Sequence, residues 1–233
     1  MQRDGRALLF DLDDTLYPQR RFILSGFAAV SRHVALRHSV DPHEAFACLV
    51  RAYKGVERGH ELDRLVASFD LPESIDGLVD IMRSHRPTLR IEWTMVDTLQ
   101  QLRRSWALAV VTNGVPSVQR AKVQALGLDS LVDTVVYASE HGTGAGKPDR
   151  APFREALSRI GSRPSRAIFV GDNPEADIAG ASLCGLRTIY TRQWRTQPWP
   201  FAHLRPDSVV RHISEVPAVA SLLFTRKLVH HAA

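Results

Sequence analysis

A short apolar run near the N-terminus, Ala7–Phe10, is followed at once by three carboxylates, Asp11, Asp13 and Asp14. Such a run, bounded by polar residues, is typical of a buried β-strand. Open α/β sheets present the carboxyl ends of their strands to the ligand crevice, so these acids lie where chemistry would occur. Three acids at one strand end repel one another, and a bound divalent cation would relieve that repulsion. A solvated acidic turn after an edge strand is the simpler alternative.

Further apolar runs predict more strands, separated by segments with helical spacing of apolar residues. The run at 106–112 is apolar throughout, as is typical of a parallel strand buried on both faces. Alternating strands and helices predict an α/β protein. The other predicted strands are 131–138, 167–170, 186–191 and 208–213, and the predicted helices are 93–104, 117–126, one beginning near 178 and a short one from 217.

Between residues 18 and 87 the apolar spacing becomes helical, and no strand is predicted. The second of four expected helices begins with Asp41 as N-cap and Pro42 in the first helical position. We therefore predict a core of residues 1–17 and 88–233 and a helical insertion of residues 18–87. The apolar positions of the four helices are Phe22, Ile23, Phe27, Val30, Val34 and Leu36; Ala45, Phe46, Leu49, Val50 and Tyr53; Leu62, Leu65, Val66 and Phe69; Ile75, Leu78, Val79 and Met82.

Three later strand ends also carry candidate functional residues. One strand ends in Thr-Asn-Gly, which taken alone is merely a good turn. The next leads into a glycine-rich stretch, in which the backbone can approach a ligand closely. The lone lysine in this stretch is either a site residue or a plain surface-loop lysine. The third leads into Gly-Asp with a further aspartate five residues on. These candidates are Thr112, Asn113, Lys147, Asp172 and Asp177.

In chain order, the motifs are D-x-D-x-T at 11–15, the strand end at Thr112, G-x-x-K-P-D at 144–149 and G-D-x-x-x-x-D at 171–177. Together they resemble those of the haloacid dehalogenase (HAD) superfamily, in its phosphatase branch. The resemblance covers residues 7–17 and about 88–215. It implies an α/β fold with a doubly wound, mostly parallel sheet and a helical C1 cap, which residues 18–87 match by position and helical character.

The resemblance also implies catalytic roles. Asp11 would be the nucleophile that forms an aspartyl-phosphate, and Asp13 the general acid/base two residues on. Thr112 would hold a phosphate oxygen through its hydroxyl group, and neighbouring main-chain N–H groups, as at Asn113, would assist. Lys147 would offset the negative charge between the nucleophile and the phosphate.

A magnesium site is implied in the same way. Its direct ligands would be Asp11, Asp172 and the main-chain carbonyl of Asp13. Asp177 would lie outside these ligands and orient Lys147 or a metal-bound water. Hard carboxylate oxygens together with substrate phosphate and water suit the octahedral shell of Mg²⁺.

The function that the sequence predicts is Mg²⁺-dependent hydrolysis of a phosphomonoester, such as a nucleoside monophosphate, flavin mononucleotide or a sugar phosphate. A non-catalytic regulator or scaffold would be expected to have lost a motif residue, and none is missing. Dehalogenases of the superfamily lack the second acid of the first motif, which is present here as Asp13. A phosphonate hydrolase would need an extra lysine from the cap, where only Lys54 occurs.

Composition narrows the partners. The net charge is +5 and the pI about 9.6, but the basic residues are mostly scattered arginines, which favours a small anionic substrate over nucleic acid. Cys48 and Cys184 show no zinc or C-x-x-C spacing, and no signal peptide or membrane span is predicted, so we expect a cytoplasmic protein. The oligomeric state and the role of the Trp/Pro-rich stretch 193–206 stay open. Candidate substrate contacts in the cap, or plain surface residues, are Arg20, Arg21, His85 and Arg86.

Overall fold

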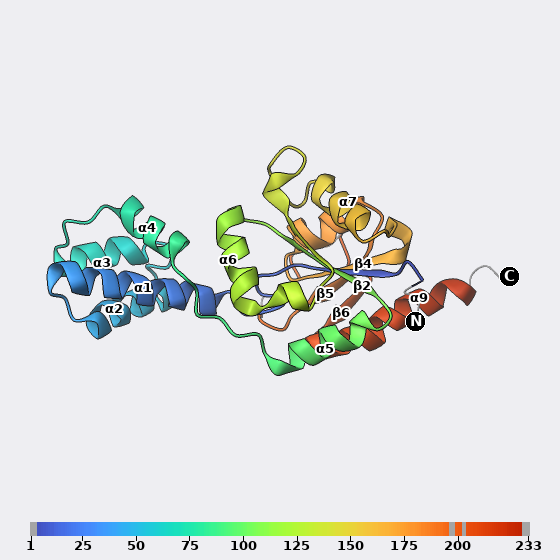
Figure 1. Ribbon diagram of the computed structural model, residues 1–233, viewed down its shortest axis with the longest axis horizontal. Helices are drawn as coiled ribbons and strands as arrows, with labels where there is room; N and C mark the ends of the chain where they lie inside the picture. The colour runs from blue at the N-terminus through green and yellow to red at the C-terminus, as the bar shows by residue number, and fades with distance from the viewer. Residues whose placement is uncertain (1–3, 196–198, 202–203, 230–233) are drawn as a thin grey trace. The chain divides into compact units, whose positions relative to one another are not determined.

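The computed structural model describes residues 4–195, 199–201 and 204–229 (Figure 1). Contacts divide the chain into two compact units. The α/β unit comprises Met1–Pro18 with Arg90–Ala233, and the helical unit comprises Gln19–Leu89. Across the described ranges, no helix combines the length and the apolar character that crossing a bilayer requires.

The α/β unit is built on one sheet of six parallel strands in the order β3-β2-β1-β4-β5-β6. The chain lays down β1, β2 and β3 in one direction and then returns to place β4 on the other side of β1. This reversal is the topological switch point at which open α/β sheets bind their ligands. The predicted α/β, doubly wound sheet is thus confirmed. The strands are β1 (Ala7–Phe10), β2 (Ala107–Thr112), β3 (Thr134–Tyr137), β4 (Ala167–Gly171), β5 (Arg187–Thr191) and β6 (Ser208–Val210).

Helices cover the sheet on both faces, which explains why its central strands are continuously apolar. Ala7 and Leu9 of β1 belong to the same buried cluster as Phe153 of α7. Because successive side chains of a strand point to opposite faces, Leu8 and Phe10 point to the other face of the sheet. Helices α5 and α9 pack against each other, as do α7 and α8 (Figure 1). The helices are α5 (Trp93–Arg103), α6 (Pro116–Leu126), α7 (Arg150–Arg159), α8 (Gly180–Leu183) and α9 (Val216–Val229).

Several predicted boundaries in this unit need correction. The strand predicted at 131–138 begins only at Thr134, because a 3₁₀ turn, η1 (Leu128–Ser130), continues into backbone bonds that Leu131 and Val132 donate to Leu128. The helix expected near 178 begins earlier, as a π-helical turn, η4 (Pro174–Ala179).

The C-terminal end also differs from its prediction. The strand predicted at 208–213 ends at Val210, because the Glu215 carboxylate accepts hydrogen bonds from the main-chain N–H groups of Arg211 and His212 and starts a 3₁₀ turn, η5 (Ile213–Glu215). The helix that follows was expected to be short. It spans 14 residues from Val216, with Pro217 in its first turn, where a missing N–H costs nothing.

The helical unit contains the four expected helices, α1 (Arg20–His38), α2 (Pro42–Lys54), α3 (Glu61–Phe69) and α4 (Ile75–Ser84). Asp41 caps α2 as predicted, since its carboxylate accepts hydrogen bonds from the N–H groups of His43 and Glu44. Leu36 was wrongly placed on the apolar face of α1 and is 88% exposed. Two residues beyond the buried Val34, the helix has turned about 200°.

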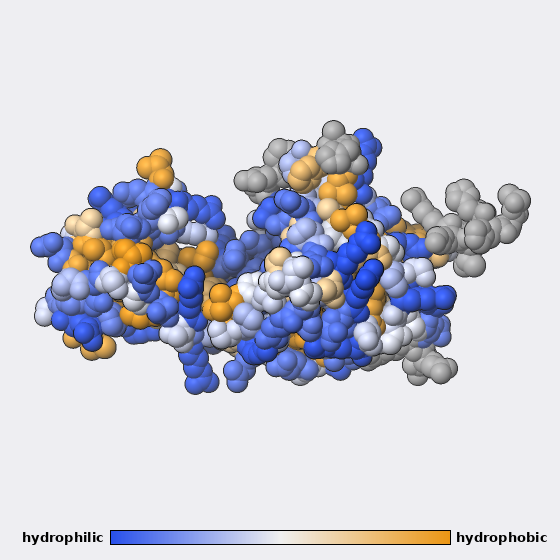
Figure 2. Space-filling view, turned by 90° about the horizontal axis from the view of Figure 1, so that it is seen from above, coloured by the Kyte–Doolittle hydropathy of each residue, from blue (hydrophilic) through white to orange (hydrophobic). Residues whose placement is uncertain are grey.

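The surface of the helical unit carries apolar side chains, seen in orange among hydrophilic residues (Figure 2).

Of the candidate substrate contacts, Arg20 and Arg86 are exposed and Arg21 is half-buried. His85 is held within the unit, where Nδ1 donates to the Met82 carbonyl oxygen at 2.6 Å and Nε2 accepts from Ser25 Oγ at 3.1 Å.

Candidate active site

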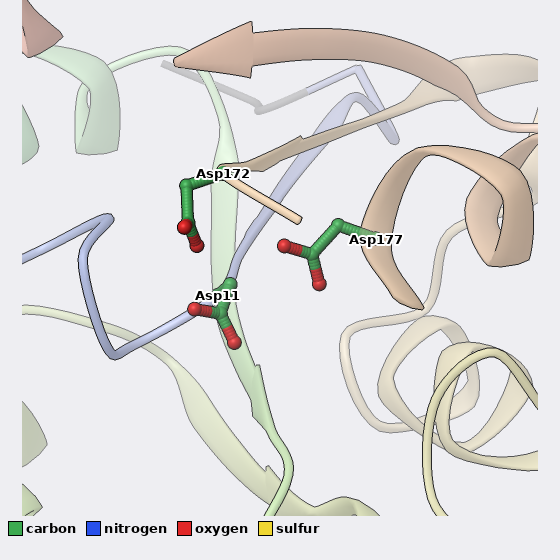
Figure 3. Close-up of side chains that lie close together, drawn as sticks. All are labelled: Asp11, Asp172 and Asp177. Carbon is green, nitrogen blue, oxygen red and sulfur yellow. The ribbon is translucent and has the colours of Figure 1, made fainter. Parts of the chain in front are cut away.

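Three aspartates meet at the switch point of the sheet. Asp11 follows β1, Asp172 follows the neighbouring β4, and Asp177 lies one turn further on, in η4. Their side chains point toward one another (Figure 3), and one carboxylate oxygen from each lies within 4.8 Å of the others. The register places Phe10 beside Val170, so Asp11 follows on beside Gly171, one residue before Asp172.

Lys147 binds two of these acids at once. Its ammonium group lies 2.5 Å from Asp11 Oδ1 and 2.8 Å from Asp177 Oδ1, and it donates to the carbonyl oxygen of Val111 at 2.8 Å. Two of these contacts are hydrogen bonds, to Asp11 and to Val111, and the third is an ion pair with Asp177. The side chain is 1% exposed, and its position is therefore fixed by the protein.

Two close approaches hold Lys147 and Asp177 in place. Asn113 clamps the main chain of Lys147, since its Oδ1 accepts from the Lys147 N–H and its Nδ2 donates to the Lys147 carbonyl oxygen, both at 2.8 Å. Gly146 sits against this clamp with φ +79°, and a Cβ there would lie 2.7 Å from Asn113 Oδ1. At Gly171, a Cβ would lie 2.3 Å from Asp177 Oδ2, so only glycine at this position leaves room for the Asp177 carboxylate.

Burial and mutual repulsion shape the ionisation of the cluster. Burial raises the pKa of Asp11, although the Lys147 ammonium opposes this shift. Burial alone would lower the pKa of Lys147, but the Asp11 and Asp177 carboxylates raise it above its ordinary value. Burial, reinforced by Asp177 and opposed by Arg195, raises the pKa of Asp172 to about 7.

The acid cluster fits a divalent cation. Three carboxylates face one ammonium and the Arg195 guanidinium, so the cluster carries surplus negative charge, which adds to burial in raising the pKa values of Asp11 and Asp172. Hard oxygen donors suit Mg²⁺ or a similar ion. The Asp177 carboxylate contacts Lys147 and also accepts a hydrogen bond from the main-chain N–H of Asn173 at 3.0 Å.

The Asp13 side chain lies outside this cluster, among partners of its own. Tyr17 donates its hydroxyl to Asp13 Oδ1 at 2.5 Å, and Gln119 Nε2 donates to Oδ2 at 2.9 Å. Lys122 Nζ lies 2.9 Å from Oδ1 and 2.8 Å from Oδ2. Between Asp13 and Tyr17, the N–H of Asp14 donates to the Tyr17 carbonyl oxygen, and Asp14 itself takes a left-handed conformation, φ 54°.

The sequence analysis did not identify Gln119, Lys122 or Arg195 as site residues. Gln119 also contacts Thr112, whose hydroxyl oxygen accepts from its Nε2 at 2.5 Å. Arg195, which belongs to the stretch 193–206, has its Nε 2.6 Å from Asp172 Oδ2; residues 196–198 and 202–203 of that stretch lie outside the described part. For Lys122, one signal was available: it is one of only four lysines in an arginine-rich chain.

Comparison with known proteins identifies the family. A family model described as "haloacid dehalogenase-like hydrolase" matches residues 6–185, which is most of the chain. The chain belongs to this family. The HAD motifs read from the sequence lie within the matched range, and the site described above is built from them.

Several curated relatives are phosphatases. The chain is 35% identical over 202 residues to ribulose-1,5-bisphosphate 5-phosphatase of Halopiger xanaduensis, covering 78% of this chain and 83% of that protein. It is 31% identical over 207 residues to glyceraldehyde 3-phosphate phosphatase of Methanothermobacter thermautotrophicus, covering 82% and 88%. The chain is thus a HAD-type phosphatase.

Solved structures show the same fold. A HAD phosphatase from Thermococcus onnurineus superposes with a TM-score of 0.60 at 22% identity, over 92% of this chain and 97% of that one. A 2-haloacid dehalogenase from Pseudomonas syringae pv. Tomato gives a TM-score of 0.63 at 26% identity, over 94% and 99%.

Proposed function

We propose that this HAD protein is a metal-dependent phosphomonoesterase that acts through an aspartyl-phosphate at Asp11. The observation that carries the proposal is the contact of the buried Lys147 ammonium with Asp11 at the carboxyl end of β1, beside Asp172. A carboxylate that attacks phosphorus must stay ionised next to an anion. A fixed cation within hydrogen-bonding distance stabilises that charged form.

The site residues divide the work. Asp11 attacks phosphorus, while the Thr112 hydroxyl and the main-chain N–H of Asn113 hold phosphate oxygens. Asp13 gives its proton to the leaving oxygen and later takes one from the attacking water. Asp11, Asp172 and the main-chain carbonyl of Asp13 would hold Mg²⁺, which supplies positive charge to the transferring phosphoryl group.

The proposed substrate is a small phosphorylated metabolite. The relatives named above act on a sugar bisphosphate and on a three-carbon sugar phosphate by their names, which supports sugar phosphates first. Nucleoside monophosphates and flavin mononucleotide stay in the panel. The net charge of +5 is consistent with an anionic substrate.

We assign the helical unit, predicted as residues 18–87, the role of a C1 cap. Its exposed Arg20 and Arg86 and half-buried Arg21 are the candidate substrate contacts. The paired ring nitrogens of His85 support a structural role for that residue instead. The free thiols of Cys48 and Cys184 are consistent with the proposed cytoplasmic location.

Dehalogenation is the second candidate, because a 2-haloacid dehalogenase is among the similar structures. A halide leaves without a proton, so such an enzyme has no use for a proton donor. Asp13, whose carboxyl group contacts Tyr17, Gln119 and Lys122, is the proposed proton donor, and its presence therefore supports the phosphatase. A non-catalytic regulator is disfavoured because a protein without catalysis would be expected to have lost a motif residue. Asp11, Asp13, Lys147 and Asp172 are all present.

The test is hydrolysis of p-nitrophenyl phosphate by the purified full chain, with Mg²⁺ and with EDTA. We expect metal-dependent turnover that Asp11→Asn abolishes and that Asp97→Asn, an exposed acid on α5, leaves unchanged. A panel of sugar phosphates, nucleoside monophosphates, flavin mononucleotide and 2-chloropropionate then ranks the substrates. Release of chloride with no phosphatase activity would overturn the proposal, as would turnover that Asp11→Asn does not affect.

A further inference from the structure

Helix α6 supplies two polar side chains to the Asp13 carboxylate. Gln119 and Lys122 are three residues apart and therefore share one face of the helix. Both are buried, with Gln119 2% exposed and Lys122 4% exposed. Long polar residues on a helix normally face solvent, so two that turn inward toward one carboxylate need a reason.

The orientation of the Gln119 amide is fixed by its surroundings. The Asp13 carboxylate and the Asn113 carbonyl oxygen, 2.9 and 2.8 Å away, can only accept, so the group facing them is the NH₂. The same Nε2 lies 2.5 Å from Thr112 Oγ1. Gln119 thus joins the carboxylate of Asp13 to the hydroxyl proposed to hold the phosphate.

Lys122 supplies the charge of this arrangement. Its side chain is 5% exposed and the Asp13 side chain 19% exposed, so the lysine is the more deeply buried member of the pair. Tyr17, 1% exposed, holds Oδ1 from another side, and burial together with the nearby Asp13 carboxylate raises the pKa of its hydroxyl, which therefore stays a donor. A buried ion pair is weak evidence for stability, which leaves room for a role in positioning.

We propose that Gln119 and Lys122 of α6, with Tyr17, are positioning residues that fix the Asp13 carboxyl group beside Thr112, where it meets the leaving oxygen of the substrate. This inference rests on the proposed phosphatase function. In the step concerned, a bond forms between an Asp11 oxygen and phosphorus while the bond from phosphorus to the leaving oxygen breaks. Asp13 in its protonated form gives its proton to that leaving oxygen and is left as the carboxylate that Tyr17, Gln119 and Lys122 contact in the structure.

The leaving group provides a readout that a merely structural role would not move. An alkoxide needs the proton as it departs, whereas 2,4-dinitrophenolate is stable without it. The quantity to compare is kcat/KM, which covers the steps up to departure of the leaving group. The two substrates are 2,4-dinitrophenyl phosphate and the best alkyl phosphate of the panel.

We expect Lys122→Met to lower kcat/KM for the alkyl phosphate at least about tenfold more than for 2,4-dinitrophenyl phosphate, since general acid catalysis is worth about 10²- to 10⁴-fold. Lys122→Arg, which keeps the charge, recovers part of the loss. Gln124→Met, an exposed position of α6, serves as the matched control and behaves as wild type. Adding Lys122→Met to Asp13→Asn causes no further loss, because the lysine acts through that carboxyl group.

Equal losses for both substrates would overturn the inference, and so would a full additional loss in the Asp13→Asn background. If Lys122→Met does not fold, as judged by circular dichroism, Gln119→Leu is measured in the same way with the same expectation. Wild-type protein that hydrolyses neither phosphate would instead refute the proposed function. The two failures are therefore distinguishable.

Discussion

Replacing Lys147 by methionine tests whether its ammonium group holds the buried carboxylates of Asp11 and Asp177 together. Methionine keeps much of the side-chain volume but removes the charge and three donors. The side chains of Lys147 and Asp177 are each 1% exposed and that of Asp11 is 11% exposed, so water cannot replace the lost contacts. Removing one partner of a buried ion pair costs about 3–5 kcal/mol.

Coulomb's law gives the same scale. One oxygen of Asp11 and one of Asp177 lie within 4.8 Å of each other. At an effective dielectric constant of about 20, two unit charges at that distance repel by about 3.5 kcal/mol, a repulsion that the Lys147 ammonium offsets and that its removal leaves uncompensated. We therefore expect Lys147→Met to lower the free energy of unfolding by about 3–4 kcal/mol at about pH 8 without metal, against about 5–15 kcal/mol for a typical domain.

The loss depends on pH with a defined sign. Burial already raises the pKa of Asp11 above its value in the unfolded chain, and removing the ammonium raises it further. Between the pKa of Asp11 in the unfolded chain and its pKa in the folded protein, the folded state binds more protons than the unfolded state. Stability therefore falls as pH rises through that range. The deficit of the variant therefore grows with pH between the folded-state pKa of Asp11 with Lys147 and the higher one without it, and it is smaller at acid pH than at about pH 8.

The assay is urea denaturation in EDTA at about pH 8 and about pH 5.5. Arg163→Met, an exposed cation in the same unit, is the control and should change stability by less than about 0.5 kcal/mol. A loss below about 1 kcal/mol for Lys147→Met at pH 8, or an equal loss at both pH values, would refute the reasoning.

Two further predictions concern the same cluster. Burial, reinforced by Asp177, raises the pKa of Asp172 to about 7, so protons compete with the metal and Mg²⁺ affinity should weaken as pH falls from about 8 to about 6. Isothermal titration calorimetry measures this, and equal affinities at both values would contradict it. Gly171→Ala would place a Cβ 2.3 Å from Asp177 Oδ2 and should cost about 1–3 kcal/mol of stability together with most of the phosphatase activity. Thermal denaturation and p-nitrophenyl phosphate turnover check it, and a variant as stable and active as wild type would rule out the clash.

The sequence predicts those residues whose position follows from a strand end. Asp11 and Asp172 come directly after apolar runs that are buried on both faces, and parallel strands bring such positions to one edge of a sheet. Lys147 and Asp177 are further from their strands, and they were identified by the motifs that surround them. The structure adds the physical reason, since Gly146 and Gly171 make room for close approaches that no larger residue allows.

The residues that the sequence did not identify lie on a helix or in irregular chain. Gln119 and Lys122 are polar residues on the buried side of α6, and a sequence pattern based on polarity alone assigns such residues to solvent. Arg195 belongs to a stretch without periodicity, so no pattern relates it to Asp172. The prediction that Leu36 lies on the apolar face of α1 was wrong for the opposite reason. It counted apolar residues without regard to how far the helix turns in two residues.

The position of Asp13 has a consequence for how such enzymes diversify. Its described partners, Tyr17, Gln119 and Lys122, all belong to the α/β unit, although the helical unit separates the first from the others in sequence. Splicing between Pro18 and Arg90 would therefore retain all three of these partners. Evolution, or a protein engineer, can exchange the segment proposed to choose the substrate while keeping these three contacts of the proposed general acid.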